Sequence, residues 1–205
     1  MREADAPQKR MAEATESVRK NDYRAAIANL DPLARLGSLE AMYWLGHLCY
    51  RGGHGIARDY AKAHYWFEKA FNAGGFDSFF GRAAAIRLHE IYSGGMGVNV
   101  DERRAFMFVS RFEEIENPSL ADAPGLFRAA IGYECGMGIQ RDRKRAIILY
   151  RRAARLGHIW SSIALARRRV MRGNLFAVIP WMISSAHAQA VMLRKGMDKE
   201  PRLWL

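Results

Sequence analysis

Residues 59–74 read DYAKAHYWFEKAFNAG, and residues 142–157 read DRKRAIILYRRAARLG. The two stretches differ at most positions, yet both begin with Asp, carry Ala at the fifth and twelfth positions and end on Gly at the sixteenth. In the first stretch, residues recur with the i, i+3, i+4, i+7 spacing of one helix face: Ala63, Trp66, Phe67 and Ala70. Asp59 stands where a helix N-cap is expected, and Gly74 stands where a helix ends. The shared skeleton therefore predicts two related helices.

The skeleton belongs to a longer repeat. Three segments align on a glycine loop followed by Asp: GGHGIARD at 52–59, GGMGVNVD at 94–101 and CGMGIQRD at 135–142, with the Asp residues 42 and 41 positions apart. Small residues precede each loop at matched positions (Ala41, Ala84 and Gly125), and a large apolar residue follows each Asp by seven positions (Trp66, Phe108 and Leu149). A fixed period of this length predicts helix pairs that stack on their neighbours.

Two weaker copies flank these three. Residues 22–37 keep Asp22, Ala26 and Gly37, whereas residues 174–189 keep Trp181 and Ala186 but lack the Asp and the closing Gly. We therefore expect an all-α fold, a right-handed α-solenoid superhelix of about five antiparallel helix pairs, with the first helix of each pair lining a concave surface. The expected pairs are 8–20 with 22–36, 38–51 with 59–73, 77–93 with 101–116, 120–134 with 142–156, and 158–172 with 174–194. The expected organisation is an N-terminal segment with a capping helix at 1–20, the solenoid at 21–190, and a C-terminal cap or tail at 191–205.

The segment LGHLCYRGGHGIARDYAKAHYWFEKAFNAG, residues 45–74, resembles a Sel1-like repeat, a relative of the tetratricopeptide repeat. Residues 129–157 resemble the same repeat from Tyr133 onward, and residues 84–116 keep its loop but lose the closing Gly. The resemblance covers roughly residues 20–190. It implies a non-enzymatic adaptor that assembles other proteins, often in bacterial signalling, envelope regulation or host interaction. Some members of the family are described as binding or hydrolysing β-lactams, an alternative that the resemblance assigns to no residue of this chain.

The net charge of +11 lies entirely in the C-terminal part of the sequence. Residues 1–119 hold 16 Lys and Arg against 16 Asp and Glu, whereas residues 120–205 hold 16 against 5. Arg contacts carboxylates and phosphates through bidentate hydrogen bonds. The basic half is therefore a solvated surface, a binding surface for an acidic protein partner, or a surface for nucleic acid or anionic lipid. The aromatic residues fall at core positions of the repeat, which argues against a platform for stacking single-stranded bases. The expected partner-binding residues are Arg128, Arg141, Arg143, Arg145, Arg167, Arg168, Arg169 and Arg172.

The sequence carries no recognisable catalytic or metal-binding motif. Its six His residues form no HExxH pattern, Cys49 and Cys135 lie far apart, and the glycine loops lack the Lys-Ser/Thr of a P-loop. Ser17-Val18-Arg19-Lys20 matches SxxK, but the SDN and KTG tripeptides that complete a β-lactamase site are missing. We therefore expect no enzymatic activity, no catalytic residues, no metal and no cofactor.

The sequence also predicts no transmembrane segment. The longest apolar run, LFAVIPWMI at 175–183, is short and contains Pro180, so we expect a buried helix there. The N-terminus has no hydrophobic region of a signal peptide, which predicts a cytoplasmic protein, or a periplasmic or secreted one if a signal peptide has been removed. The final RLWL is expected to pack back as a cap, with a docking peptide as the alternative.

Overall fold

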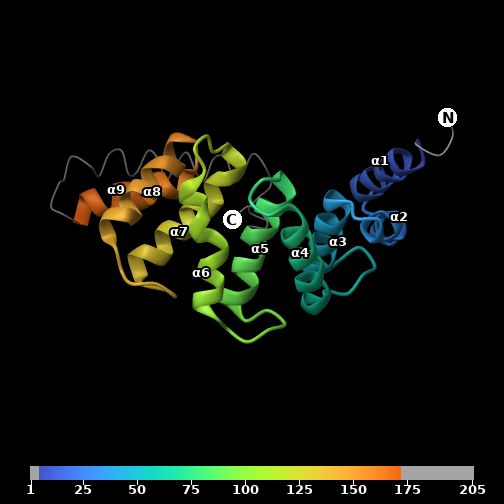
Figure 1. Cartoon of the computed structure of the whole chain (residues 1–205), viewed down its shortest axis with the longest axis horizontal. Helices are drawn as coiled ribbons and strands as arrows, with labels where there is room; N and C mark the ends of the chain where they lie inside the picture. Colours follow the sequence, from blue (N-terminus) through green and yellow to red (C-terminus); the bar gives the residue numbers. More distant parts are fainter. Residues whose placement is uncertain (1–4, 172–205) are drawn as a thin grey trace. The chain divides into compact units, whose positions relative to one another are not determined.

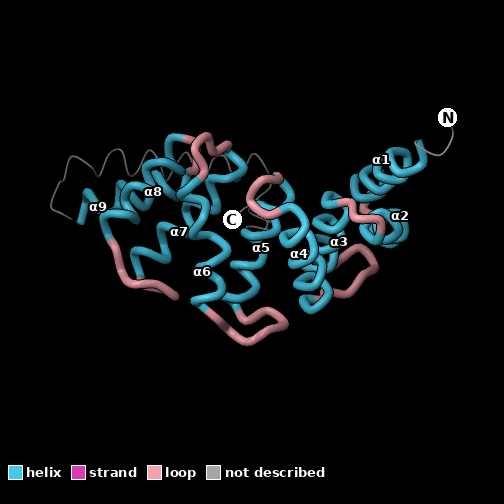
Figure 2. The backbone as a smooth tube through the Cα atoms, in the orientation of Figure 1, coloured by secondary structure: helices cyan, strands magenta, loops and turns pink. Residues whose placement is uncertain are grey.

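The computed structural model describes residues 5–171, and this part of the chain is built from helices and loops without a strand (Figure 1, Figure 2). It divides into two compact units, Met1–Phe108 and Val109–Leu205. Several expectations lie outside the described residues: the second helix of the fifth pair, the run at 175–183, Arg172, and the tail at 191–205. The expected division at residues 20 and 190 and the handedness of the superhelix stay predictions.

The first unit holds five helices and most of a sixth: α1 Asp5–Arg19, α2 Tyr23–Arg35, α3 Leu39–Arg51, α4 Tyr60–Gly74, α5 Phe79–Gly94 and α6 Glu102–Ser110. Each helix from α1 to α4 packs against the next one along the chain, and α3 also contacts α5. Because each helix buries its apolar face only against near neighbours, this is the packing of an α-solenoid. The fold class expected from the repeat is thereby confirmed.

The aspartates of the repeat cap the second helix of each pair. The side chains of Asp59 and Asp142 accept hydrogen bonds from the backbone N–H groups of Lys62 and Lys144, each at 2.9 Å. The loop that precedes each cap turns on a left-handed glycine, with φ +63° at Gly95, a conformation that suits a residue without Cβ. The cap at Asp59 was predicted from the sequence, because capping depends on residues close together in the chain.

Small residues at matched positions let the helices approach closely. Ala41 and Ala84 on the first helices and Ala63 and Ala146 on the second helices are fully buried. Gly46 has the same role, because a Cβ there would lie 2.8 Å from the Phe67 ring. Aromatic rings such as Tyr23 and Phe67 are buried in the remaining volume of the core.

The second unit contains two short 3₁₀ helices and three α-helices: η1 Arg111–Glu114, η2 Leu120–Asp122, α7 Ala123–Cys135, α8 Arg143–Arg155 and α9 Ile159–Met171. Helices α7 and α8 pack as an antiparallel pair, and α8 packs on α9. Asp122 is bonded to the backbone N–H and the hydroxyl of Ser119 in a capping box. Helix α7 begins three residues later than expected, because this box shapes the entry to it.

The helix expected at 101–116 is too long, since α6 ends at Ser110 and η1 follows it. Phe112 turns into the core of the second unit and is fully buried. The Arg152 side chain donates hydrogen bonds to the carbonyl oxygens of Glu113 and Ile115. These contacts favour a tight 3₁₀ turn over further α-helical turns, which explains the early end of α6.

Candidate functional site

The arginines expected to bind a partner occupy different environments. Arg141, Arg143 and Arg145 are exposed around the start of α8. Arg141 Nε donates to Glu134 O at 2.6 Å. Arg145 Nη1 donates to the hydroxyl of Tyr133 at 3.2 Å, and its guanidinium lies 5.4 Å from the centre of that ring. Of the three, Arg143 is the one whose side chain makes no described contact.

Three of the remaining arginines face different surroundings on α7 and α9. Arg128 is only 9% exposed, and Nη1 lies 3.4 Å from Pro124 O, so it presents little surface to a partner. Arg168 pairs with Glu134 and lies 4.7 Å from the centre of the Tyr150 ring. Arg167 is exposed on α9, whereas the side chain of Arg169 lies outside the described residues. The described arginines of the expected set therefore lie in different surroundings, and their role in partner binding stays a prediction.

A row of side chains on α8 was not among the expected residues. Lys144, Ile148, Arg151 and Arg155 are all exposed, Ile148 at 54%. Their spacing of i, i+4, i+7 and i+11 places them along one face of the helix. We call this row the basic stripe. Helical periodicity applied to the exposed residues of 143–155 would have found it in the sequence.

The acidic residues near the basic stripe are already engaged. Residues 120–171 hold eleven Lys and Arg against three acidic residues. Asp122 is 2% exposed and bonded to Ser119, and Asp142 caps α8. Glu134 accepts hydrogen bonds from Tyr150 and pairs with Arg168. Among the described residues, no carboxylate pairs with the three cations of the stripe.

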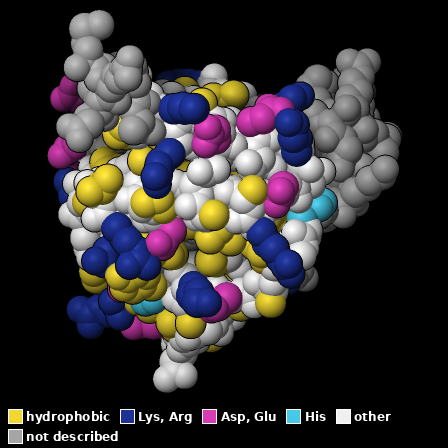
Figure 3. All heavy atoms as spheres, turned by 90° about the vertical axis from the view of Figure 1, so that its right-hand side faces the viewer, with side chains coloured by type: hydrophobic (Ala, Val, Ile, Leu, Met, Phe, Trp, Pro, Cys, Tyr) yellow, Lys and Arg dark blue, Asp and Glu magenta, His cyan; other side chains and the backbone are white. Residues whose placement is uncertain are grey.

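The first unit has a different surface. One face of the molecule shows Lys and Arg interspersed with acidic and hydrophobic side chains (Figure 3). Cations of the first unit are often paired locally. Arg35 lies 2.7 Å from Asp31, and Arg19 lies 2.7 Å from Glu16. Exposed pairs of this kind contribute little to stability, but they neutralise the surface.

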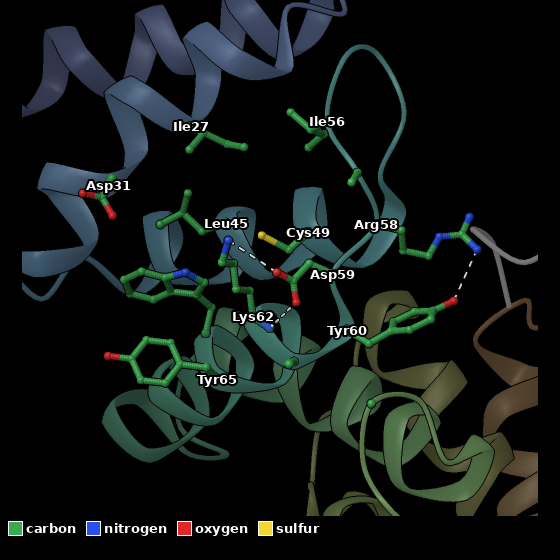
Figure 4. Close-up of a pocket in the computed structure, with 14 residues that line it drawn as sticks. Ile27, Asp31, Leu45, Cys49, Ile56, Arg58, Asp59, Tyr60, Lys62 and Tyr65 are labelled. Carbon is green, nitrogen blue, oxygen red and sulfur yellow. Dashed lines mark hydrogen bonds and ion pairs between the residues drawn. The ribbon is translucent and has the colours of Figure 1, made fainter.

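The first unit also contains a hollow of about 870 Å³ between α2, α3, α4 and the loop before α4. Ile27, Leu45 and Trp66 give it apolar walls, and Asp31 and Lys62 bring charges to it. The sulfur of Cys49 points toward the space below Ile27 and Ile56 (Figure 4). Burial, with a smaller contribution from Asp59, raises the pKa of the Cys49 thiol, so the thiol is neutral at physiological pH. The sequence indicated only that Cys49 lies far from Cys135, and this feature was missed.

The residues tested for catalysis make ordinary structural contacts. Ser17 Oγ donates to Glu13 O at 2.8 Å, and Lys20 pairs with Glu16 at 3.2 Å, so the two polar groups of the SxxK match engage other partners. Burial lowers the pKa of His47 to about 4. Within residues 5–171, no group of three or more His, Cys, Asp or Glu side chains is arranged to hold a metal ion. No helix in the described part has the length and apolar character needed to span a bilayer.

Comparison with known proteins links the repeat to a family. A family model described as "Sel1 repeat" matches residues 39–75, 82–111 and 123–158. Over 118 residues the chain is 32% identical to the "ERAD-associated E3 ubiquitin-protein ligase component HRD3B" of Arabidopsis thaliana. That match covers 57% of this chain but only 17% of the plant protein, so the chain spans a small part of its relative.

Two solved structures share the fold. The crystal structure of a Sel1 repeat protein from Oxalobacter formigenes superposes with a TM-score of 0.65 at 22% identity, covering 82% of this chain and 65% of that one. The crystal structure of a protective antigen of uropathogenic Escherichia coli, displaying an SLR fold, gives a TM-score of 0.67 at 22% identity, covering 84% of this chain and 37% of that one. At this level of identity the two likenesses establish architecture alone.

Proposed function

The chain belongs to the Sel1 repeat family, whose members generally mediate protein–protein interactions, and from this premise we propose that it is a non-enzymatic adaptor that holds an acidic segment of a partner protein on the basic stripe. The observation that carries the proposal is that the exposed cations of the basic stripe have no carboxylate partner among the described residues. Lys144, Arg151 and Arg155 are exposed on one face of α8 without a carboxylate partner among the described residues. An acidic segment would supply the missing carboxylates.

The side chain at the centre of the stripe favours a protein as the partner. Ile148 is 54% exposed and is flanked on both sides by cations. An exposed apolar group surrounded by charges is typical of a small docking surface, where apolar contact adds affinity and charges set orientation. The matching segment would carry one apolar residue between carboxylates.

Nucleic acid is the weaker alternative because α8 offers no ring for stacking. Tyr150 is the one aromatic residue of α8, and it is 2% exposed. Single-stranded nucleic acid is usually held by bases stacked on exposed aromatic side chains beside cations. The exposed arginines around the start of α8, Arg141, Arg143 and Arg145, would extend the surface for a protein segment instead.

The Arabidopsis relative is named as a component of a ubiquitin-protein ligase. A protein that works as a component of a larger assembly is in keeping with an adaptor role. The 17% of the plant protein covered by the match does not carry ligase chemistry over to this chain.

The test compares two triple variants with the same change in net charge. Lys144, Arg151 and Arg155 are reversed to Glu in one, and Lys9, Arg10 and Arg103, which are also exposed, are reversed to Glu in the control. The probes are a fluorescent 12-residue peptide with Asp and Glu around a central Leu, and a 12-nucleotide oligo(dT). We expect the stripe variant to bind the peptide at least tenfold more weakly than wild type, and the control to change less than threefold.

The same variants identify partners in cells. Affinity purification followed by mass spectrometry should recover proteins with wild type and the control that are lost with the stripe variant. Equal recovery by the stripe variant would contradict the proposal. Tighter binding of oligo(dT) than of the peptide at physiological salt would replace the acidic protein partner with nucleic acid.

A further inference from the structure

The second glycine-loop repeat shows how the fold normally fills the space at the end of a first helix. Tyr92 is 3% exposed there, and its hydroxyl donates to Glu68 Oε1 at 3.1 Å. His64 Nε2 lies 2.8 Å from the same hydroxyl. The Arg104 guanidinium lies 4.5 Å from the ring centre, and the Phe108 ring stacks at 5.7 Å. These four side chains surround the Tyr92 ring.

Cys49 occupies the position of Tyr92 in the preceding repeat. The backbone shows the equivalence, because the capping Asp donates its N–H to the carbonyl of this residue in both repeats. The distances are 2.9 Å from Asp59 N to Cys49 O and 3.0 Å from Asp101 N to Tyr92 O. In the repeat of the second unit the same position holds Tyr133, which is 4% exposed. One of the three equivalent positions therefore lacks a ring.

The surroundings of the missing ring are still present. His64 and Glu68 stand five and nine residues after their capping Asp, as Ile27 and Asp31 do after Asp22. Arg104 and Phe108 stand three and seven residues after theirs, as Lys62 and Trp66 do after Asp59. All four counterparts line the hollow of about 870 Å³: Ile27, Asp31, Lys62 and Trp66.

The ring that follows Cys49 in the chain is engaged with other aromatic residues. Tyr50, the next residue, contacts the rings of Tyr60 and Phe67 at 5.5 Å and 6.3 Å. The volume of the hollow falls within the range of about 300–1,000 Å³ that ligand pockets show. The hollow is larger than one side chain, so it also has room for neighbouring residues of a bound segment.

We propose that this hollow is a recognition site for a tyrosine side chain presented by a segment of a partner protein. The ring packs between Ile27 and Trp66, its hydroxyl donates to the Asp31 carboxylate, and the Lys62 ammonium lies over its face. Asp31 stands for Glu68, Lys62 for Arg104 and Trp66 for Phe108 in the contacts that the chain itself makes with Tyr92, whereas Ile27 replaces His64 and offers apolar contact instead of a hydrogen bond.

The residues of the sequence that the structure does not describe supply no tyrosine for this site. All eight tyrosines of the sequence lie between residues 23 and 150, so the parts of the chain outside the described residues contain none. Arg58 and Tyr65, both exposed, line the hollow, and Arg58 donates hydrogen bonds to Arg51 O at 3.2 Å and to the Tyr60 hydroxyl at 3.3 Å. The site lies in the first unit and uses aromatic recognition, so it is separate from the basic stripe.

The test uses the ¹⁵N-labelled full chain and N-acetyl-tyrosine-N-methylamide, titrated into the millimolar range. The readout is the indole N–H signal of Trp66, assigned with Trp66→Phe. The key variant is Cys49→Tyr, which supplies the ring internally and restores the residue type that two other repeats carry. Cys49→Ala is the control, because it leaves the hollow open and removes the thiol.

We expect saturable shifts for wild type and Cys49→Ala, and at least tenfold weaker binding for Cys49→Tyr. Lys62→Met should weaken binding by about threefold to tenfold through the lost cation–π contact. N-acetyl-phenylalanine-N-methylamide should bind about threefold to tenfold more weakly than the tyrosine probe, because it lacks the hydroxyl. The stripe variant should bind the tyrosine probe as wild type does, so failure of one proposal is separable from failure of the other.

The proposal is overturned if wild type shows no saturable shift, or if Cys49→Tyr binds as well as wild type. Equal shifts with N-acetyl-leucine-N-methylamide would also overturn it, since the site would then be a general apolar hollow. Loss of binding in Cys49→Ala would assign recognition to the thiol and contradict the aromatic site.

Discussion

Phe112 lies directly on Gly125, so that a Cβ at Gly125 would come within 2.4 Å of the Phe112 ring. The equivalent positions in the two preceding repeats hold Ala41 and Ala84, both fully buried. In the second unit, Phe112 comes from η1 and occupies the volume that a methyl group would take. The repeat pattern alone would allow Ala at position 125. The ring of Phe112, which comes from another helix, restricts this position to Gly.

Gly125→Ala should destabilise the protein by about 1–3 kcal/mol, because overpacking forces Phe112 out of its position. The measurement is the urea unfolding midpoint. Phe112→Leu introduced together with Gly125→Ala should recover part of the loss, since the smaller side chain makes room for the methyl group. A Gly125→Ala variant as stable as wild type would show that Phe112 relaxes freely.

Filling and emptying the tyrosine position should change stability in opposite directions. Cys49→Tyr should stabilise the protein by about 1 kcal/mol, as cavity-filling substitutions commonly do. Tyr92→Cys should cost about 2–5 kcal/mol through loss of a buried ring, and Tyr92→Phe about 1 kcal/mol through loss of the hydrogen bond to Glu68. Thermal denaturation of the three variants checks this order. Destabilisation by Cys49→Tyr would mean that the hollow does not have the shape of the Tyr92 environment.

The environment of His158 predicts loss of stability in acid. Its Nδ1 accepts a hydrogen bond from the backbone N–H of Ser161, and Arg128 lies nearby. Burial, and secondarily the Arg128 charge, lowers the pKa of His158 to about 4 from 6.5. Between pH 6.5 and pH 4 the unfolded chain therefore binds more protons than the folded chain. The contribution of neutral His158 to the free energy of unfolding is complete above pH 6.5 and is lost as the pH falls toward 4.

His158→Asn tests this contribution, because Asn keeps a capping acceptor and does not titrate. Between pH 7 and pH 4, wild type should lose on the order of 2–3 kcal/mol more unfolding free energy than the variant. Urea unfolding at several pH values gives the difference in unfolding free energy between wild type and His158→Asn. The contributions of the other titrating groups cancel in this difference. Parallel curves for the two proteins would exclude a low pKa for His158.

Asp142 should be the most sensitive of the helix caps. It accepts hydrogen bonds from the backbone N–H groups of Lys144 and Arg145, and its charge offsets the three cations of the first turn of α8. Asp142→Ala should cost about 1–2 kcal/mol, and Asp142→Asn less, because Asn keeps the cap but loses the charge. Asp59→Ala is the matched comparison, with one cation in the first turn of α4. An equal loss for Asp59→Ala and Asp142→Ala at low salt would argue against the charge effect.

The sequence by itself determined the period, the capping aspartates, the glycine loops, the first four helix pairs and the excess of basic residues after residue 119. These features depend on hydrogen bonds and φ values within a few residues of the chain, so a local pattern suffices to predict them. It also pointed to the basic half of the molecule as a binding surface. The choice of individual arginines stays a prediction, and burial of Arg128 and the ion pair of Arg168 make these two poor contacts.

Only the tertiary structure decided which side chains fill, or leave empty, the spaces between helices. The early end of α6 depends on Arg152 and Phe112, and the restriction to Gly at 125 depends on the same ring. The hollow lies beside Cys49, which stands where two other repeats carry Tyr, and the ring of Tyr50 packs against Tyr60 and Phe67. Contacts of this kind join residues from different helices, whose distances are set by packing of the whole unit and not by the spacing of residues along the chain.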